Sequence, residues 1–168
     1  MTEADAELVD VVDETGQPVG VVTRREMRAR RLPHRTSYVL VFNRRGELFI
    51  HQRTLTKDVY PGHWDVAVGG VLAAGESFAA GAQREVAEEL GVERALEPLF
   101  PLRYADAHTV VHGMVYRLVH EGPFRLQPEE IVRGEFVTLE EIDRRATREP
   151  FCPDGLAGLA EYRRRSPR

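Results

Sequence analysis

The segment from Gly70 to Val92, GVLAAGESFAAGAQREVAEELGV, constrains the fold more than any other part of the chain. Glycines at positions 69, 70 and 75 favour a tight loop, because glycine adopts backbone conformations that other residues avoid. Residues 77–90 then contain many helix formers and no proline, which predicts a helix. The segment therefore predicts a loop that leads directly into a helix.

The predicted helix carries an apolar stripe beside an acidic one. At about 100° per residue, its apolar side collects Ala79, Ala82, Val86 and Leu90. The adjacent side carries three glutamates that repel one another on a free helix, Glu85, Glu88 and Glu89. A hard cation such as Mg²⁺ prefers carboxylate and carbonyl oxygens, so a bound metal would offset this repulsion. The alternative is an ordinary solvated acidic face.

The spacing of residues in this segment matches a long family pattern: Gly, five residues, Glu, seven residues, then Arg-Glu-apolar-any-Glu-Glu-any-Gly-apolar. The matching residues are Gly70, Glu76, Arg84, Glu85, Val86, Glu88, Glu89, Gly91 and Val92. The segment therefore resembles the Nudix box, and we use that name for residues 70–92. The resemblance implies a metal-dependent pyrophosphohydrolase, in which Mg²⁺, or Mn²⁺ in its place, helps a water attack a diphosphate bond.

The resemblance also implies a role for each matching side chain. It makes Glu85, Glu88 and Glu89 metal ligands, together with a loop carbonyl at Gly69 or Gly70, of which we take Gly69. It makes Arg84 and Glu76 an orienting pair, because a guanidinium can hold a carboxylate through two parallel hydrogen bonds. Glu85 or a more distant glutamate would accept the proton of the attacking water.

In the family, the general base often lies on a loop beyond the box. Glu129 and Glu130 occupy such a place in the stretch LQPEEIVRGEFV, and we take Glu130 as the base. Arg53 and Lys57 precede the box and are the expected contacts for substrate phosphate. For all four residues the alternative is an exposed charge without a functional role.

The residues before the box resemble isopentenyl-diphosphate isomerases and the Nudix hydrolases most similar to them. This likeness is carried by residues 34–36, Arg53, Lys57 and the run YPGHWD at residues 60–65. Isomerases have a catalytic cysteine and a metal-binding histidine where this chain has glycine at 69 and 70 and valine at 71. Isomerase activity is therefore not expected. We accordingly expect His34, which matches a metal ligand of the isomerases, to be a turn or surface histidine.

The remaining sequence predicts a mixed sheet between helices, an α/β/α architecture of the Nudix kind with an N-terminal β-hairpin. Expected strands are residues 8–12, 18–23, 37–42, 48–51, 64–68, 99–104, 110–118 and 135–137. Expected helices are residues 24–31, 77–90, 139–146 and 153–164. Trp64 and Tyr60 are expected to pack in or around the core, with stacking on a nucleobase as the alternative. The whole chain, residues 1–168, is expected to form one domain.

Composition and net charge limit which binding partners and which cellular location are expected. The net charge of −4 offers no general attraction to a nucleic-acid polymer or an anionic membrane, so a small diphosphate is the expected partner. The single cysteine and the absence of a signal-like start predict a cytoplasmic protein. A homodimer stays open, and so does a second function, a sensor that binds a phosphorylated metabolite without hydrolysing it.

Overall fold

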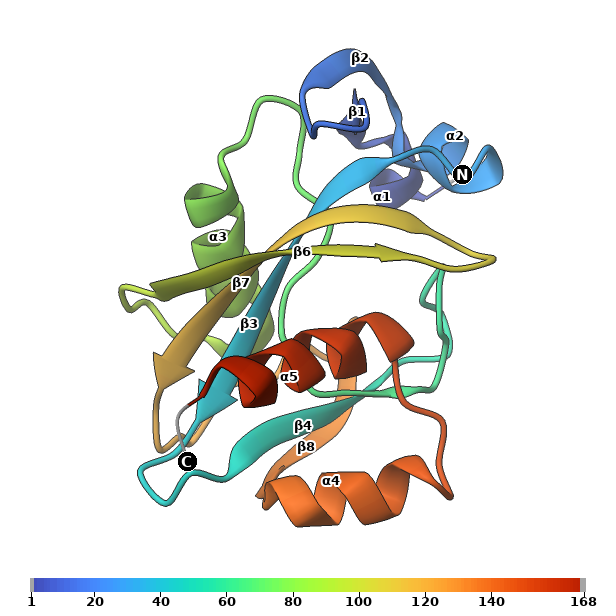
Figure 1. Cartoon of the computed structure of the whole chain (residues 1–168). Helices are drawn as coiled ribbons and strands as arrows, with labels where there is room; N and C mark the ends of the chain where they lie inside the picture. Colours follow the sequence, from blue (N-terminus) through green and yellow to red (C-terminus); the bar gives the residue numbers. More distant parts are fainter. Residues whose placement is uncertain (1, 167–168) are drawn as a thin grey trace.

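A computed structural model describes residues 2–166 of the chain (Figure 1). Its helices are α1 (Glu3–Ala6), α2 (Arg24–Ala29), α3 (Phe78–Leu90), α4 (Leu139–Ala146) and α5 (Pro153–Arg165). Its strands are β1 (Leu8–Val12), β2 (Pro18–Thr23), β3 (His34–Phe42), β4 (Leu48–Arg53), β5 (Trp64–Asp65), β6 (Glu97–Ala105), β7 (Val110–Val119) and β8 (Ile131–Val137). None of the helices in this part of the chain is long and apolar enough to cross a membrane.

The strands form one mixed sheet around β3. β3 runs parallel to β7 from His34, opposite Val111, to Phe42, opposite Val119. All other pairs of named strands are antiparallel: β1 with β2 and β3, β4 with β3, β5 and β8, and β6 with β7. The hairpin of β1 and β2 extends the sheet at one edge, as the sequence predicts.

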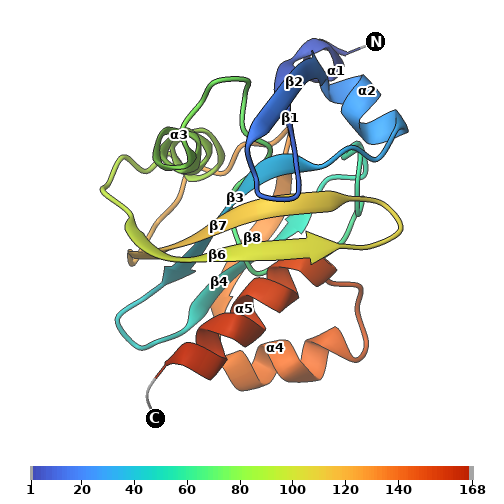
Figure 2. The ribbon, with the colours of Figure 1, turned by 45° about the horizontal axis from the view of Figure 1, so that its top comes forward.

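Helices cover both faces of the sheet (Figures 1 and 2). On one face α3 buries Val86 and Leu90 against Val39 and Val41 of β3. On the other face α4 and α5 pack on the neighbouring residues of the same strand, Leu40 and Phe42. β3 is buried on both sides, which explains the continuous apolar run of its second half, residues 38–42. The predicted α/β/α arrangement is therefore confirmed.

The box has the predicted form of a loop followed by a helix. The Ser77 side chain caps α3 by accepting a hydrogen bond from the N–H of Ala80 at 3.1 Å. Gly91 ends the helix in the left-handed conformation, with φ of 70°, which glycine adopts without steric cost. These two residues fix the ends of the helix and hence the positions of its glutamates relative to the loop.

Several predicted boundaries are wrong for identifiable reasons. The predicted helix 24–31 ends at Ala29, and Arg31 has a positive φ of 51°. The predicted strand 64–68 shrinks to β5, because the Asp65 side chain takes the N–H of Ala67 at 3.1 Å and breaks the extended pairing. β3 begins at His34, so this histidine is 1% exposed and the prediction of a turn or surface histidine is wrong. Trp64 is buried in the core, as expected.

Candidate active site

The loop of the box is held to α3 by a two-pronged ion pair. Arg84 donates from Nε to Glu76 Oε2 at 2.8 Å and from Nη2 to Glu76 Oε1 at 2.9 Å. This is the parallel geometry expected of an orienting pair. Glu76 also accepts the N–H of Ala73 at 3.1 Å, so the carboxylate ties together the loop and the helix.

The same guanidinium reaches two of the predicted metal ligands. Arg84 Nη1 lies 3.0 Å from Glu85 Oε1 and 3.3 Å from Glu88 Oε2. Glu88 is the outer of the two, with its side chain 48% exposed against 14% for Glu85. One cation therefore serves three carboxylates and leaves negative charge on this face of α3.

Glu85 and Glu89 meet the backbone of the glycine loop. Gly69 donates its N–H to Glu89 Oε2 at 3.1 Å. A Cβ at Gly70 would stand 2.9 Å from Glu85 Oε1, which shows how closely that carboxylate approaches the loop. The carbonyl of Gly70 accepts the N–H of Ser37 at 3.0 Å, and this favours Gly69 as the predicted carbonyl ligand. The two inner glutamates therefore approach neighbouring residues of the loop, Glu89 at Gly69 and Glu85 at Gly70.

Burial makes the charged forms of these two glutamates unfavourable. The pKa of Glu89 is raised well above its ordinary range, first by burial and then by the nearby charge of Glu85. Burial also raises the pKa of Glu85, and Arg84 acts in the opposite direction. Lys57 lies near enough for its charge to lower the pKa of both. The described residues supply no ion pair to Glu89, so its buried charge lacks a direct partner.

These residues fit a hard divalent cation, with one difference from the prediction. Two buried carboxylates beside a loop carbonyl offer oxygens of the kind that Mg²⁺ and Mn²⁺ bind. However, no three His, Cys, Asp or Glu side chains within residues 2–166 lie close enough together to hold a metal ion. Glu88, with its side chain 48% exposed, points outward from the buried pair and contacts Arg84 Nη1 at 3.3 Å.

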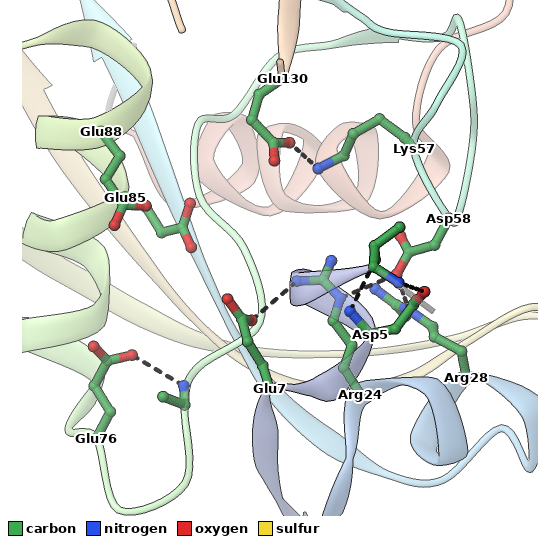
Figure 3. A network of polar contacts seen from close by, with 12 residues as sticks. Asp5, Glu7, Arg24, Arg28, Lys57, Asp58, Glu76, Glu85, Glu88 and Glu130 are labelled. Atoms are coloured by element: carbon green, nitrogen blue, oxygen red, sulfur yellow. Dashed lines mark hydrogen bonds and ion pairs between the residues drawn. The ribbon is translucent and has the colours of Figure 1, made fainter.

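Lys57, the predicted phosphate contact, and Glu130, the predicted general base, form an ion pair on the side of the site opposite α3 (Figure 3). Lys57 Nζ contacts Glu130 Oε2 although 73 positions separate them in the chain. The side chain of Lys57 is 15% exposed and that of Glu130 is 32% exposed. The charge of Lys57 lowers the pKa of Glu89 and that of Glu130 raises it, so the structure brings both residues near the buried glutamates.

A second cationic group, not anticipated as part of the site, lies beside Lys57 (Figure 3). Arg24 and Arg28 of α2 both donate from Nε to Asp58 Oδ2, each at 3.0 Å. The two guanidinium groups hold the pKa of Asp58 well below its usual range, against the effect of burial. The i, i+4 spacing of the two arginines could have indicated this cationic group from the sequence, because it places both side chains on one face of a helix.

A pocket opens between these cations and the glycine loop. Its rim includes Arg24, Arg28, Lys57 and Gly70. Its interior includes Arg53, whose Nη2 donates to the carbonyl of Val59 at 3.0 Å and whose Nη1 lies 3.9 Å from Asp65 Oδ2. Arg53 is therefore partly engaged with the protein, and its role as a phosphate contact stays a prediction. Asp65 and Asp154 also line the pocket and were missed, because no spacing links residues so far apart.

Comparison with known proteins agrees with the motif. A model of the NUDIX domain matches residues 32–154. An uncharacterized Nudix hydrolase of Pseudomonas aeruginosa is 41% identical over 160 residues, which cover 95% of each chain. YfcD of Escherichia coli strain K12, another uncharacterized Nudix hydrolase, is 35% identical over 164 residues, or 97% of this chain and 90% of YfcD.

Solved structures agree with the fold. DR0079 from Deinococcus radiodurans superimposes with a TM-score of 0.81 at 29% identity, covering 93% of this chain and 98% of DR0079. The NUDIX domain of Shewanella oneidensis NrtR, solved as a complex with ADP ribose, has a TM-score of 0.65 at 18% identity, covering 86% and 99%. The second likeness concerns the fold alone. With the sequence matches, these findings show that the chain belongs to the Nudix family.

Proposed function

We propose that the protein is a divalent-metal-dependent hydrolase that cleaves the diphosphate bond of a nucleoside diphosphate derivative or a similar small diphosphate. The observation that carries this proposal is the placement of Glu85 and Glu89. Both are largely buried carboxylates, they converge on the Gly69–Gly70 backbone, and Arg84 serves only the first of them. A cation would offset their charge on the side of the cleft that faces Lys57.

In the proposed reaction, separate groups of residues orient the metal ligands and bind the phosphate. Arg84 and Glu76 hold the glycine loop against α3, so that Glu85 and Glu89 keep their positions. Lys57 and Arg53 receive phosphate oxygens as cations in the pocket. Bound Mg²⁺, or Mn²⁺ in its place, would neutralise phosphate oxygens and lower the pKa of the attacking water.

The Lys57–Glu130 ion pair suggests how substrate prepares the base. In the absence of substrate the carboxylate of Glu130 is engaged by Lys57. A phosphate group competes for the same ammonium, and its arrival would release Glu130 to accept the proton of the water. Glu130 therefore stays our choice of general base, with Glu85 as the alternative.

The experiment that tests this proposal follows the products by phosphorus NMR. The panel contains nucleoside di- and triphosphates, nucleotide sugars, dinucleotide cofactors and isopentenyl diphosphate, each with Mg²⁺, Mn²⁺ or a chelator. Cleavage of one class that disappears with the chelator would support metal-dependent hydrolysis. An absence of turnover with every compound would argue against it.

The first prediction concerns Glu89→Gln. Glutamine keeps the shape and can still accept the N–H of Gly69, but it removes the charge that would bind the cation. We expect turnover to fall by two or more orders of magnitude while the thermal unfolding midpoint stays equal or rises, because a buried charge is lost. Glu93→Gln, at an exposed position just beyond α3, is the matched control and should keep full activity. Full activity in Glu89→Gln would reject the metal-site assignment.

A sensor that binds a phosphorylated metabolite is the second function that the structure leaves to test. Tight binding of a diphosphate without turnover would support it. The resemblance to the isopentenyl-diphosphate isomerase-like Nudix hydrolases, a cytoplasmic location and a single domain remain predictions from the sequence, and the homodimer stays open.

A further inference from the structure

The buried end of the pocket differs in chemistry from its cationic rim. Its walls come from one face of β3, from β5 and from the first turn of α5. His34, Tyr38, Asp65 and Cys152 are buried residues, whereas Arg24, Arg28 and Lys57 at the rim are partly exposed. A diphosphate at the rim would therefore direct its attached group into this end.

The buried end presents hydrogen-bond acceptors. Asp154 already accepts the Tyr38 hydroxyl at 2.9 Å through Oδ2, and a carboxylate oxygen accepts more than one hydrogen bond. Asp65 accepts the N–H of Ala67 at 3.1 Å through Oδ1, and its Oδ2 lies 3.9 Å from Arg53 Nη1. His34 Nδ1 is paired with the carbonyl of Leu32 at 2.9 Å, which makes Nδ1 the donor and leaves Nε2 as an acceptor.

Thr36 supplies an independent sign that a ligand belongs here. It lies between His34 and Tyr38 on the face of β3 that lines the pocket, and it is 8% exposed. Its Oγ1 has no hydrogen-bond partner among the described residues. A buried hydroxyl without a partner is costly, and most buried polar groups have one. A polar atom of the ligand would provide the missing partner.

We propose that the buried end of the pocket selects the group attached to the diphosphate, and that Thr36 and Asp154 recognise hydrogen-bond donors on that group. The donors are an exocyclic amine of a nucleobase or hydroxyls of a sugar. A hydrocarbon would leave the hydroxyl of Thr36 unpaired and would strip water from two carboxylates without replacement. This inference builds on the proposed function but concerns binding, which can be measured separately from hydrolysis.

The test measures dissociation constants by isothermal titration calorimetry with Ca²⁺ in place of Mg²⁺, because Ca²⁺ takes the same oxygen ligands. Cytidine and uridine diphosphate form one matched pair, and adenosine and inosine diphosphate form another, since each pair differs by an amine against a carbonyl. Uridine diphosphate glucose adds sugar hydroxyls to a shared base, and isopentenyl diphosphate supplies the hydrocarbon. Preference for the amines identifies a nucleobase in the pocket, and preference for the glucose compound identifies a sugar.

The variants are Thr36→Val and Asp154→Asn, with Tyr116→Phe as control. Tyr116 is a buried tyrosine that packs on the α3 face of the sheet, away from the pocket. We expect each test variant to bind the preferred compound about tenfold more weakly and isopentenyl diphosphate unchanged. Thr36→Val should unfold at the same temperature as the wild type or higher, because its hydroxyl has no protein partner to lose. Tyr116→Phe should leave every dissociation constant unchanged.

Two results would overturn the inference. One is isopentenyl diphosphate binding as tightly as the polar compounds, or no compound binding at all. The other is an unchanged dissociation constant in both test variants. Selective binding that both variants weaken, in a protein that hydrolyses nothing with Mg²⁺ or Mn²⁺, would keep the inference and reject the proposed hydrolysis instead.

Discussion

Arg84 contacts three carboxylates at once, and its geometry predicts what a lysine there would lose. Arg84→Lys keeps the positive charge but cannot make two parallel hydrogen bonds to Glu76. We expect the free energy of unfolding to fall by about 1–2 kcal/mol, because charge-assisted hydrogen bonds are lost. We expect turnover to fall about tenfold or more, because the loop and Glu85 become less ordered. Urea denaturation and steady-state kinetics measure the two effects.

Arg94→Lys provides the comparison, since Arg94 is exposed just beyond α3. This control should match the wild type in both measurements. If Arg84→Lys also matched it, the guanidinium would not be orienting the site. A loss of stability with full turnover would assign Arg84 to the fold alone.

At the scale of residues, the sequence predicted contacts within the box and not those across the cleft. Arg84 and Glu76 lie in one motif, so the resemblance to the Nudix box implied their pairing. Lys57 and Glu130 were each predicted to have a role, but the sequence did not indicate their ion pair. Only the fold brings these two residues together, because they lie 73 positions apart in the chain. His34 was misjudged because a histidine in a strand buried on both faces has the same local sequence as one in a turn.

At the scale of elements, the glycine loop is held to β3 by backbone contact, and this predicts an intolerance of side chains at Gly69. A Cβ there would stand 2.0 Å from the carbonyl oxygen of Ser37, and the φ of 155° disfavours other residues. We expect Gly69→Ala to lower the free energy of unfolding by about 3 kcal/mol or more, because backbone must move. Urea denaturation gives the value.

Gly46→Ala separates the clash from the backbone conformation. Gly46 also has a positive φ, of 79°, but a Cβ there would have no neighbour within 4 Å. Its substitution should cost only about 1 kcal/mol, the penalty of the left-handed conformation. Equal losses in the two variants would show that close contact between the loop and β3 is unimportant.

Element types were predictable and several ends were not, for a reason that β5 illustrates. Helix α4 was predicted with its observed bounds, and in the structure the side chain of Thr138 caps it by accepting the N–H of Glu141. The strand predicted over 64–68 has the right composition, yet the side chain of Asp65 competes for the N–H of Ala67. Such side-chain competition with the backbone depends on local geometry that composition does not contain.

At the scale of the whole molecule, the pocket is assembled from α2, β3, β5, the loop after β4 and the start of α5. The sequence predicted the fold that brings these elements together and the box on one side of the cleft. It did not predict the acceptors at the buried end, because Thr36, Asp65 and Asp154 share no motif. Their association is a property of the sheet and of where α5 begins.

The burial of His34 predicts how the stability of the whole protein depends on pH. Burial lowers the pKa of His34 from 6.5 to about 4, so between these values the unfolded chain binds a proton that the folded protein does not. Stability therefore falls as the pH falls through this window, by about 2 kcal/mol between pH 7 and pH 5 from this residue. His34→Asn retains a donor for the carbonyl of Leu32 and should remove this contribution to the slope in urea denaturation, while His51, whose pKa burial lowers to about 3, still contributes in the same direction. His108→Asn, at an exposed histidine, should leave the slope as in the wild type. A slope that is unchanged in His34→Asn would show that this imidazole is charged, or solvated, in the folded protein.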